Sequence, residues 1–161
     1  MTDAIKNDLQ TIWHPCTQMK DHETIPLIMI EKGEGVYLID DNGNRYIDAI
    51  SSWWVNIFGH NNSYIKEKIF EQMQSLEHVI FAGFTHKQAI QLAQRICHLT
   101  QGEKVFFADN GRSGVEVALK ISFHYHQNNN KHRPLFAHLQ GSYHGETLGA
   151  LAVGDLGLYK E

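Results

Sequence analysis

Residues 104–120, KVFFADNGRSGVEVALK, contain the strand–turn–helix unit that decides the fold class. The apolar run at 104–108 predicts a β-strand, and the polar stretch 109–111 ends it. A helical period follows at once and predicts a helix over 113–127. A strand that leads directly into a helix is typical of parallel sheets whose strands are joined by helical crossovers.

The segments on either side continue this alternation of helices and strands. Thr85 and Gln88 have the spacing of a capping box. The helix predicted after them has an apolar stripe formed by Ala89, Leu92, Ala93, Ile96 and Cys97. PLFAHL at 134–139 predicts a second strand, and 141–155 a further turn or helix. This order predicts an α/β fold for the second half of the chain.

The first half predicts a small antiparallel β-meander. Three β-rich runs are separated by turn residues and lie at 27–31, 36–40 and 45–50. Asn42-Gly43 lies between the last two runs, and we expect a tight hairpin turn because both residues tolerate positive φ. Helices are expected at 4–12 and from Ser63 onward.

The turn after the strand at 104–108 has the composition of a phosphate site. Ser113 and Glu116 have the spacing of a capping box, while Gly111 and Gly114 let the backbone approach a ligand closely. Free N–H groups at a helix start favour an anion. No Gly-Lys-Ser/Thr follows, so this is not a Walker A loop, and it lacks the first glycine of GxGxxG. An ordinary strand-to-helix turn is the alternative.

A second stretch, GSYHGET at 141–147, also follows a predicted strand. Ligands of open α/β sheets bind at the carboxyl ends of the strands, where both stretches would lie. Tyr143 is suited to stacking on a flat ring, with a phosphate near Gly111. The two features together predict a planar phosphorylated cofactor, of which pyridoxal phosphate is the obvious case. A half-buried core aromatic is the alternative for Tyr143.

The composition gives no sign of a nucleic-acid or membrane partner. Of the 161 residues, 42% are hydrophobic and 20% are charged, and the formal net charge is −4. No apolar stretch has the length of a membrane span, and the start lacks the pattern of a signal peptide. Cys16 and Cys97 lie far apart, which favours a reducing compartment, so we expect a cytoplasmic protein. The histidines show no HExxH spacing, and we expect no metal site.

Four stretches together resemble the class III aminotransferases, and within them the branch that serves biotin synthesis. They are IWHPCTQM at 12–19, GEGVYLIDDNGNRYIDAISSWWVNIFGHNN at 33–62, FFADNGRSGVEVALK at 106–120 and GSYHGETLGALAVGD at 141–155. The likeness covers essentially the whole chain. It implies fold type I of the pyridoxal-phosphate-dependent transferases. Residues 1–60 would then form an N-terminal segment with the meander of the small domain, and 61–161 the start of the large cofactor-binding domain.

The resemblance implies roles for five residues. Gly111 and Arg112 belong to the loop that binds the cofactor phosphate, and Tyr143 packs on the pyridine ring. Trp53 and Trp54 line the substrate pocket. Flat apolar walls suit a long aliphatic substrate with polar ends, and core packing is the alternative for the two indoles.

The resemblance also implies a reaction and partners. S-adenosylmethionine donates an amino group to bound pyridoxal 5'-phosphate, which passes it to the ketone of 8-amino-7-oxononanoate and gives 7,8-diaminononanoate. The family works as a homodimer with active sites at the subunit interface. The expected partners are therefore these small molecules and a second copy of the chain, with no nucleic acid and no membrane.

Three departures from the family pattern bear on these roles. Arg112 stands where this branch usually has Ser, so a guanidinium replaces a hydroxyl beside the phosphate. Cys16 stands where a Tyr often lies near the substrate. The lysine that forms the Schiff base has no matching position, and no motif marks Lys104 or Lys120 for that task. We therefore expect the N-terminal part of such an enzyme, with no catalytic residue and no activity as 161 residues alone.

Two other interpretations stay open. The first is another class III aminotransferase that acts on ornithine, 4-aminobutyrate or a diamine, against which the Trp53-Trp54 pair and the Trp-His-Pro start at 13–15 argue. The second is a non-catalytic phosphate-binding or interaction module, because no catalytic lysine is identifiable; an unstable remnant without function is a variant of this non-catalytic interpretation.

Overall fold

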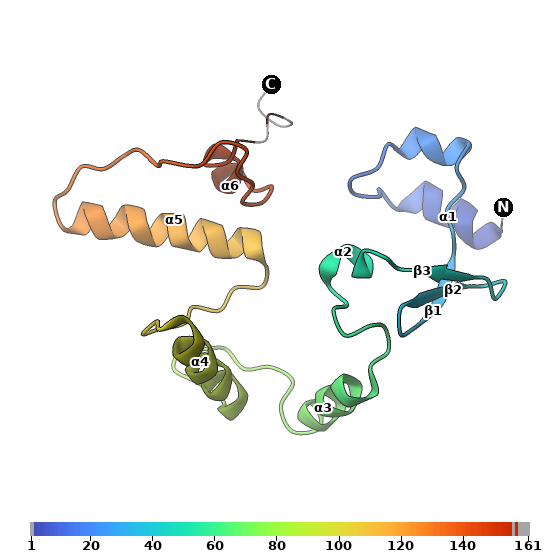
Figure 1. Ribbon diagram of the computed structural model, residues 1–161, viewed down its shortest axis with the longest axis horizontal. Helices are drawn as coiled ribbons and strands as arrows, with labels where there is room; N and C mark the ends of the chain where they lie inside the picture. Colours follow the sequence, from blue (N-terminus) through green and yellow to red (C-terminus); the bar gives the residue numbers. More distant parts are fainter. Residues whose placement is uncertain (1, 156, 158–161) are drawn as a thin grey trace. The chain divides into compact units, whose positions relative to one another are not determined.

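The computed structural model of this protein describes residues 2–155 and 157. The chain forms two compact units, Met1–Ile80 and Phe81–Glu161, each with its own secondary structure (Figure 1). The division predicted at residue 60 concerns the domains of the whole family fold and stays a prediction.

The first unit begins with helix α1, Asp3–Thr11, which confirms the helix predicted over 4–12. The Thr2 hydroxyl caps this helix by accepting an N–H of its first turn at 3.4 Å. The segment after the helix is held back against it, because His14 Nε2 lies 2.6 Å from Asp8 Oδ2. A short 3₁₀ helix, η1, follows at Met19–Glu23.

A three-stranded antiparallel sheet follows in the order β1-β2-β3, with β1 at Ile30–Glu34, β2 at Tyr37–Asp40 and β3 at Arg45–Ile47. This sheet confirms the predicted meander, although each strand is shorter than or shifted from its predicted range. The isolated bridge between Gly35 and His60 ties a later segment to the turn between β1 and β2.

The hairpin between β2 and β3 differs from the prediction in its turn. Gly43 has a φ of +83°, but Asn42 does not have a positive φ. The Asp40 N–H donates to the Asn44 carbonyl at 3.0 Å, so the loop has three residues, 41–43. The Asp40 carboxylate accepts the N–H groups of Asn42 at 3.0 Å and Asn44 at 2.8 Å. These bonds favour the three-residue loop over a two-residue Asn-Gly turn.

Two helical elements complete the first unit. α2, Ser51–Trp54, is a single turn in which all four residues have positive φ, from +47° to +67°. It is therefore left-handed, a conformation that L-residues rarely adopt in succession. α3, Ser63–Met73, is right-handed and confirms the helix predicted from Ser63. Asn62 caps it by accepting the Ile65 N–H at 3.1 Å.

The described part of the second unit contains α4 at Lys87–Thr100, α5 at Gly111–Asn128 and α6 at Leu148–Ala152. All three helices fall where helical patterns were predicted, but the start of α4 differs. His86, and not Thr85, is the cap, because its Nδ1 accepts the Ala89 N–H at 3.4 Å. The capping box predicted for Thr85 and Gln88 is therefore wrong by one residue.

The strands predicted at 104–108 and 134–139 are not formed in the described part of the second unit. The sheet among the described residues is the three-stranded one of the first unit. A strand exists through hydrogen bonds to a neighbouring strand, whereas an apolar run reports only side-chain composition. Neither segment has such a neighbour among the described residues. The two predicted strands are therefore wrong for this part of the chain, whereas the helices predicted after them, α5 and α6, are confirmed.

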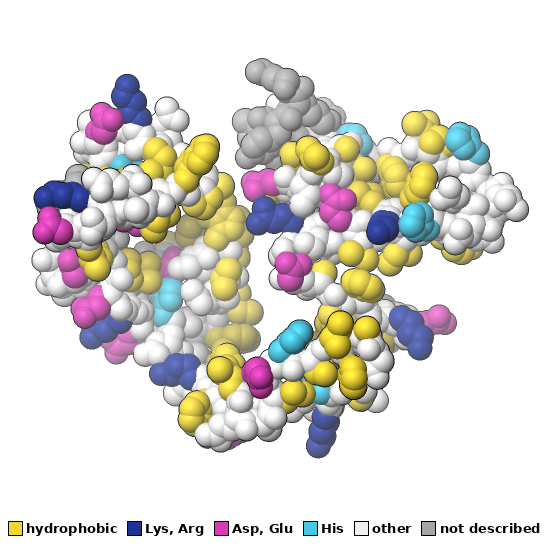
Figure 2. All heavy atoms as spheres, turned by 180° about the vertical axis from the view of Figure 1, so that it is seen from behind, with side chains coloured by type: hydrophobic (Ala, Val, Ile, Leu, Met, Phe, Trp, Pro, Cys, Tyr) yellow, Lys and Arg dark blue, Asp and Glu magenta, His cyan; other side chains and the backbone are white. Residues whose placement is uncertain are grey.

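Few apolar side chains are fully enclosed. Among the described residues, Ile39 is 7% exposed and Ala150 is 0% exposed, and these two form the buried apolar set. Figure 2 shows hydrophobic side chains spread over the face in view. The predicted stripe of α4 is half-buried except at Leu92, which is 50% exposed. Helix caps and hydrogen bonds therefore contribute much to positioning the residues at the start of α5 and in α2.

Candidate functional site

The start of helix α5 lies at the predicted phosphate site. Asn110 caps the helix: its Oδ1 accepts the Ser113 N–H at 3.0 Å, and its carbonyl accepts the Gly114 N–H at 3.0 Å. The predicted capping box of Ser113 and Glu116 is wrong, because the helix begins earlier, at Gly111, and Asn110 takes the cap position.

Two backbone donors at this helix start point to no acceptor in the described part of the chain. They are the N–H groups of Gly111 and Arg112, since Asn110 satisfies the next two. The approach to Gly111 is open, because an added Cβ would meet no atom within 4 Å. The aligned peptides of the 18-residue helix place about half a positive charge at this end. The helix start can therefore bind an anion through two donors and a favourable dipole.

The loop of the second predicted stretch crosses the first turn of α5. A Cβ on Gly145 would lie 2.5 Å from Arg112 Cβ, and Gly145 has a φ of +117°, so this passage requires glycine. The Arg112 guanidinium lies 3.5 Å from the Glu146 carboxylate, a half-exposed pair that contributes little stability. The structure thus brings Arg112 and the segment of Tyr143 together within the second unit.

Glu116 holds helix α6 against α5. Its carboxylate accepts the Gly149 N–H at 2.9 Å. The Thr147 hydroxyl, followed by the backbone N–H groups of Gly149 and Ala150, keeps the pKa of Glu116 below its ordinary value. This contact is not among those predicted from the sequence. The only local signal is Thr147 before an apolar run, which is typical of the helix cap that it forms with Ala150.

Tyr143 lies in the same loop, two residues before Gly145. Its side chain is 54% exposed, which is not the environment of a core aromatic. The loop that carries Tyr143 therefore passes over the start of α5 through Gly145 and Glu146, which lie beside Arg112.

Trp53 and Trp54 lie on the left-handed turn α2 in the first unit. They are 63% and 70% exposed, and their ring centroids lie 5.5 Å apart with the planes tilted by 57°. Such exposure is not that of core residues. Left-handed backbone costs an L-residue about 1–2 kcal/mol, so four such residues in succession need other interactions to hold them.

Asp48 makes the side-chain contacts that hold this turn. Its Oδ2 accepts the Ser52 hydroxyl at 2.7 Å and lies 2.8 Å from His60 Nε2. The side chains of Asp48 and His60 are 6% and 13% exposed. The Ser52 N–H and hydroxyl, and then His60, keep the pKa of Asp48 below its ordinary value, against the effect of burial. This pair is not among those predicted from the sequence, because the two residues are 12 positions apart and no local pattern links them.

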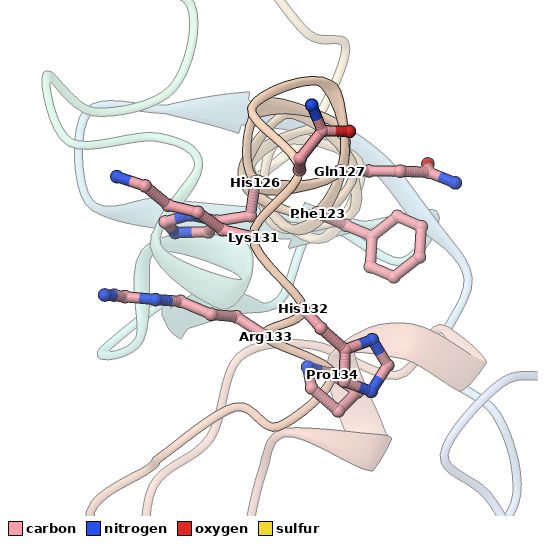
Figure 3. Close-up of a pocket in the computed structure, with 8 residues that line it drawn as sticks. Phe123, His126, Gln127, Lys131, His132, Arg133 and Pro134 are labelled. Atoms are coloured by element: carbon pink, nitrogen blue, oxygen red, sulfur yellow. The ribbon is translucent and has the colours of Figure 1, made fainter.

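A separate hollow lies at the other end of α5 (Figure 3). Lys131 and Arg133 point to one side of it and Phe123 to the other. An 18-residue helix is about 27 Å long, so this hollow is remote from Gly111. Basic side chains complement the negative end of a helix, which accounts for the charge here without a ligand.

No group of three or more His, Cys, Asp or Glu side chains among the described residues is arranged to hold a metal ion. None of the helices in the described ranges is long and apolar enough to cross a bilayer. Cys16 and Cys97 are free thiols.

Comparison with known proteins confirms the family resemblance that the four sequence stretches indicate. The family model for Aminotransferase class-III matches residues 17–160. The chain belongs to the class III aminotransferases. Among its relatives, the adenosylmethionine-8-amino-7-oxononanoate aminotransferase of Helicobacter pylori is 55% identical over 156 residues, which are 96% of this chain and 36% of that protein.

Solved structures show the same fold as this class III chain. The adenosylmethionine-8-amino-7-oxononanoate aminotransferase from Methanocaldococcus jannaschii matches with a TM-score of 0.89 and 38% identity, over 95% of this chain and 36% of that one. The omega transaminase from Pseudomonas jessenii in complex with PMP matches with a TM-score of 0.88 and 25% identity, over 96% and 35%. The predicted α/β class, fold type I, is thereby confirmed. The chain spans about a third of the length of these relatives, 36% for the first.

Proposed function

We propose that this chain acts within an aminotransferase of biotin synthesis, which moves an amino group from S-adenosylmethionine to 8-amino-7-oxononanoate and gives 7,8-diaminononanoate. The observation that carries the proposal is the 55% identity to the Helicobacter pylori enzyme over 96% of this chain. The chain corresponds to 36% of that enzyme, so its activity, substrates and partners are part of the proposal.

Pyridoxal phosphate is the proposed cofactor, and the residues present fit it. The N–H groups of Gly111 and Arg112 would bind the phosphate at the positive end of α5, where no Cβ blocks the approach to Gly111. Tyr143 would hold the flat ring by packing against it. When bound, this cofactor supplies the electron sink that amino-group transfer needs. The described chain contributes binding and orientation, and no catalytic residue is proposed in it.

Arg112 adds charge to this site. Its guanidinium lies beside Glu146 at the first turn of α5, and its side chain is 52% exposed. A bound phosphate would compete with Glu146 for the guanidinium and would gain a charge-assisted hydrogen bond. The substitution Arg112→Ser, which supplies the usual residue of this branch, should keep cofactor binding through the backbone donors and weaken it by the loss of this charge.

Trp53 and Trp54 are proposed to contact the amino acceptor. Their exposed, mutually tilted rings offer flat apolar surface. A long aliphatic chain with polar ends, such as that of 8-amino-7-oxononanoate, suits such a surface.

A second candidate is a class III aminotransferase with another substrate, such as ornithine, 4-aminobutyrate or a diamine. The TM-score of 0.88 to the omega transaminase favours this broader assignment. The biotin branch is preferred, because the identity is 25% for that structure and 55% for the Helicobacter pylori enzyme.

The test uses the complete gene product from the source organism, whose intact mass is compared with the 18.4 kDa of this chain. It is incubated with pyridoxal phosphate, S-adenosylmethionine and 8-amino-7-oxononanoate, and 7,8-diaminononanoate is measured. We expect product from the complete gene product and none from the 161-residue polypeptide alone. Turnover of ornithine or 4-aminobutyrate without turnover of 8-amino-7-oxononanoate would favour the second candidate. Turnover by the short polypeptide would contradict its proposed inactivity.

Localisation and assembly are also part of the proposal. We expect a cytoplasmic homodimer, as the family resemblance implies. Light scattering of the complete gene product should give twice the mass of its single chain, and a monomer with full activity would contradict the homodimer.

A further inference from the structure

Asp48 and His60 meet beside the left-handed turn that carries the two indoles. The Asp48 carboxylate lies 2.7 Å from the Ser52 hydroxyl and 2.8 Å from His60 Nε2. Ser52 directly precedes Trp53 in the chain. The carboxylate therefore fixes the backbone position from which the Trp53-Trp54 pair extends.

The His60 ring is itself held in one orientation. The backbone of His60 exchanges two hydrogen bonds with Gly35, at 2.7 Å and 3.1 Å. The side chain lies over Gly33, where an added Cβ would meet His60 Cβ at 2.6 Å. The Asn56 amide lies 3.4 Å from Nδ1, so Nδ1 accepts and Nε2–H is left to donate to Asp48. His60 is thus bonded to the β1–β2 turn through its backbone and to Asp48 through its ring, so it fixes the carboxylate relative to the sheet.

Among the side chains of the turn itself, burial contributes little to holding it. Its four positive φ values are unfavourable for L-residues, and strain of this kind persists only where surrounding contacts fix it. Trp53 and Trp54 are 63% and 70% exposed, so burial of the indoles does not supply that constraint. The backbone contributes the bonds from the Ser51 N–H to the Asp48 carbonyl at 3.2 Å, from the Trp54 N–H to the Ile50 carbonyl at 2.8 Å and from the Asn56 N–H to the Ser51 carbonyl at 3.0 Å. Asp48 adds the side-chain contact to Ser52.

A second carboxylate–histidine pair offers a comparison within the same unit. Asp8 and His14 lie 2.6 Å apart and join α1 to the segment that follows it. No residue of that segment between them has a positive φ. Asp48 and His60 have the same chemistry, but their carboxylate has the additional Ser52 partner inside the strained turn.

We propose that Asp48 and His60 are positioning residues, which set the pose of Trp53 and Trp54 toward the substrate by holding Ser52 in the left-handed turn. The inference rests on the proposed function in one respect, the assignment of the two indoles to the substrate. His60 orients the carboxylate, the carboxylate holds Ser52, and the indoles keep their mutual tilt. Neither Asp48 nor His60 contacts the substrate.

The test compares variants of the complete gene product. Asp48→Asn removes the charged acceptor at constant size, and His60→Leu removes the donor. His60→Gln restores a donor and serves as the rescue variant. Asp8→Asn is the matched control, because it weakens a carboxylate–histidine pair of the same unit that lies outside the strained turn.

Two readouts are needed. The exciton-coupled circular dichroism of the neighbouring indoles reports their pose without turnover. Trp53→Phe removes one indole of the pair and gives the reference for complete loss of the coupled signal. The KM for 8-amino-7-oxononanoate reports the consequence for the substrate, with kcat measured alongside it. We expect Asp48→Asn and His60→Leu to lose the coupled signal and raise KM about tenfold, as for a lost apolar contact. His60→Gln and Asp8→Asn should keep both.

An unchanged coupled signal in Asp48→Asn would overturn the positioning role. Equal loss of the signal in Asp8→Asn would also overturn it, because the damage would then be general. If the signal is lost while KM is unchanged, and Trp53→Ala raises KM, the link from pose to substrate fails. If Trp53→Ala and Trp54→Ala both leave KM unchanged, the assignment of the indoles under the proposed function fails, and the inference falls with it.

Discussion

Replacing Gly145 with Ala tests the close passage of the Tyr143 loop over the first turn of α5. The new Cβ would lie 2.5 Å from Arg112 Cβ and 3.1 Å from Arg112 Cα, whereas ordinary contact begins at 3.4 Å. These atoms belong to the helix and not to a flexible side-chain end, so the loop has to move. The movement would carry Tyr143 away from the helix start.

The expected magnitude has two parts. The φ of +117° at Gly145 lies in the range that L-residues avoid, at a cost of about 1–2 kcal/mol. Overpacking against the helix adds about 1–3 kcal/mol. We expect Gly145→Ala to lower the free energy of unfolding of the second unit by about 3 kcal/mol. Gly141→Ala has only the first cost, about 1–2 kcal/mol, because its φ is +70° and its Cβ would meet no atom within 4 Å.

Two measurements on the complete gene product separate these effects. Urea-dependent hydrogen exchange of the amides at 143–150 gives the local free energy of opening. Titration with pyridoxal phosphate, followed by its absorbance, gives the cofactor affinity. Gly145→Ala should lower both more than Gly141→Ala does. Equal effects of the two substitutions would refute the reasoning, because the contact with Arg112 would then contribute nothing.

Three further substitutions test other contacts. Asn110→Ala should destabilise α5 by about 1 kcal/mol through loss of its cap, while Asn110→Ser keeps it; a thermal melt showing no difference between them would contradict the cap. Ile39→Ala should cost about 2–4 kcal/mol in urea unfolding, well above Ile47→Ala, because the two residues are 7% and 68% exposed. The pKa of Asp48 is lowered in the folded protein. Its contribution to the free energy of unfolding is therefore fully present above the ordinary pKa of 3.8, and it is lost as the pH falls through the folded-state pKa. Acid unfolding of Asp48→Asn should therefore depend less on pH there, and an unchanged dependence would exclude this role.

The meander and the helices could be predicted because local composition and side-chain period report them directly. β-rich runs separated by turn residues predicted β2 and β3, and the helical period predicted α3 and α5. The helix caps were harder to predict, because neighbouring residues have side chains that are equally suited to the cap position. At α5 both Asn110 and Ser113 fit a capping pattern, and the geometry selects Asn110. Glu116 then bonds to Gly149, 33 residues away, which no local pattern reports.

The candidate site divides in the same way. The helix start at Gly111 and the loop of Tyr143 were predicted from composition, and the structure brings the two segments together in one unit. Asp48 and His60 were missed because they are 12 residues apart and meet across a turn whose handedness no propensity suggests. Likewise, the strand predicted at 104–108 depended on a pairing partner that an apolar run cannot specify.

The turn at 51–54 also has a consequence for chirality. Its backbone angles mirror those of a right-handed helix and are the ones that D-amino acids prefer. A semisynthetic chain with D-serine at position 52 should therefore fold more stably than the natural enantiomer, while keeping the hydroxyl but redirecting it from Asp48. Glycine at position 51 should relieve strain as well, and should loosen the unfolded chain in return. At this turn, backbone handedness favours a D-residue for stability, whereas the L-Ser52 hydroxyl, held by Asp48, defines the pose of the indoles under the inference above.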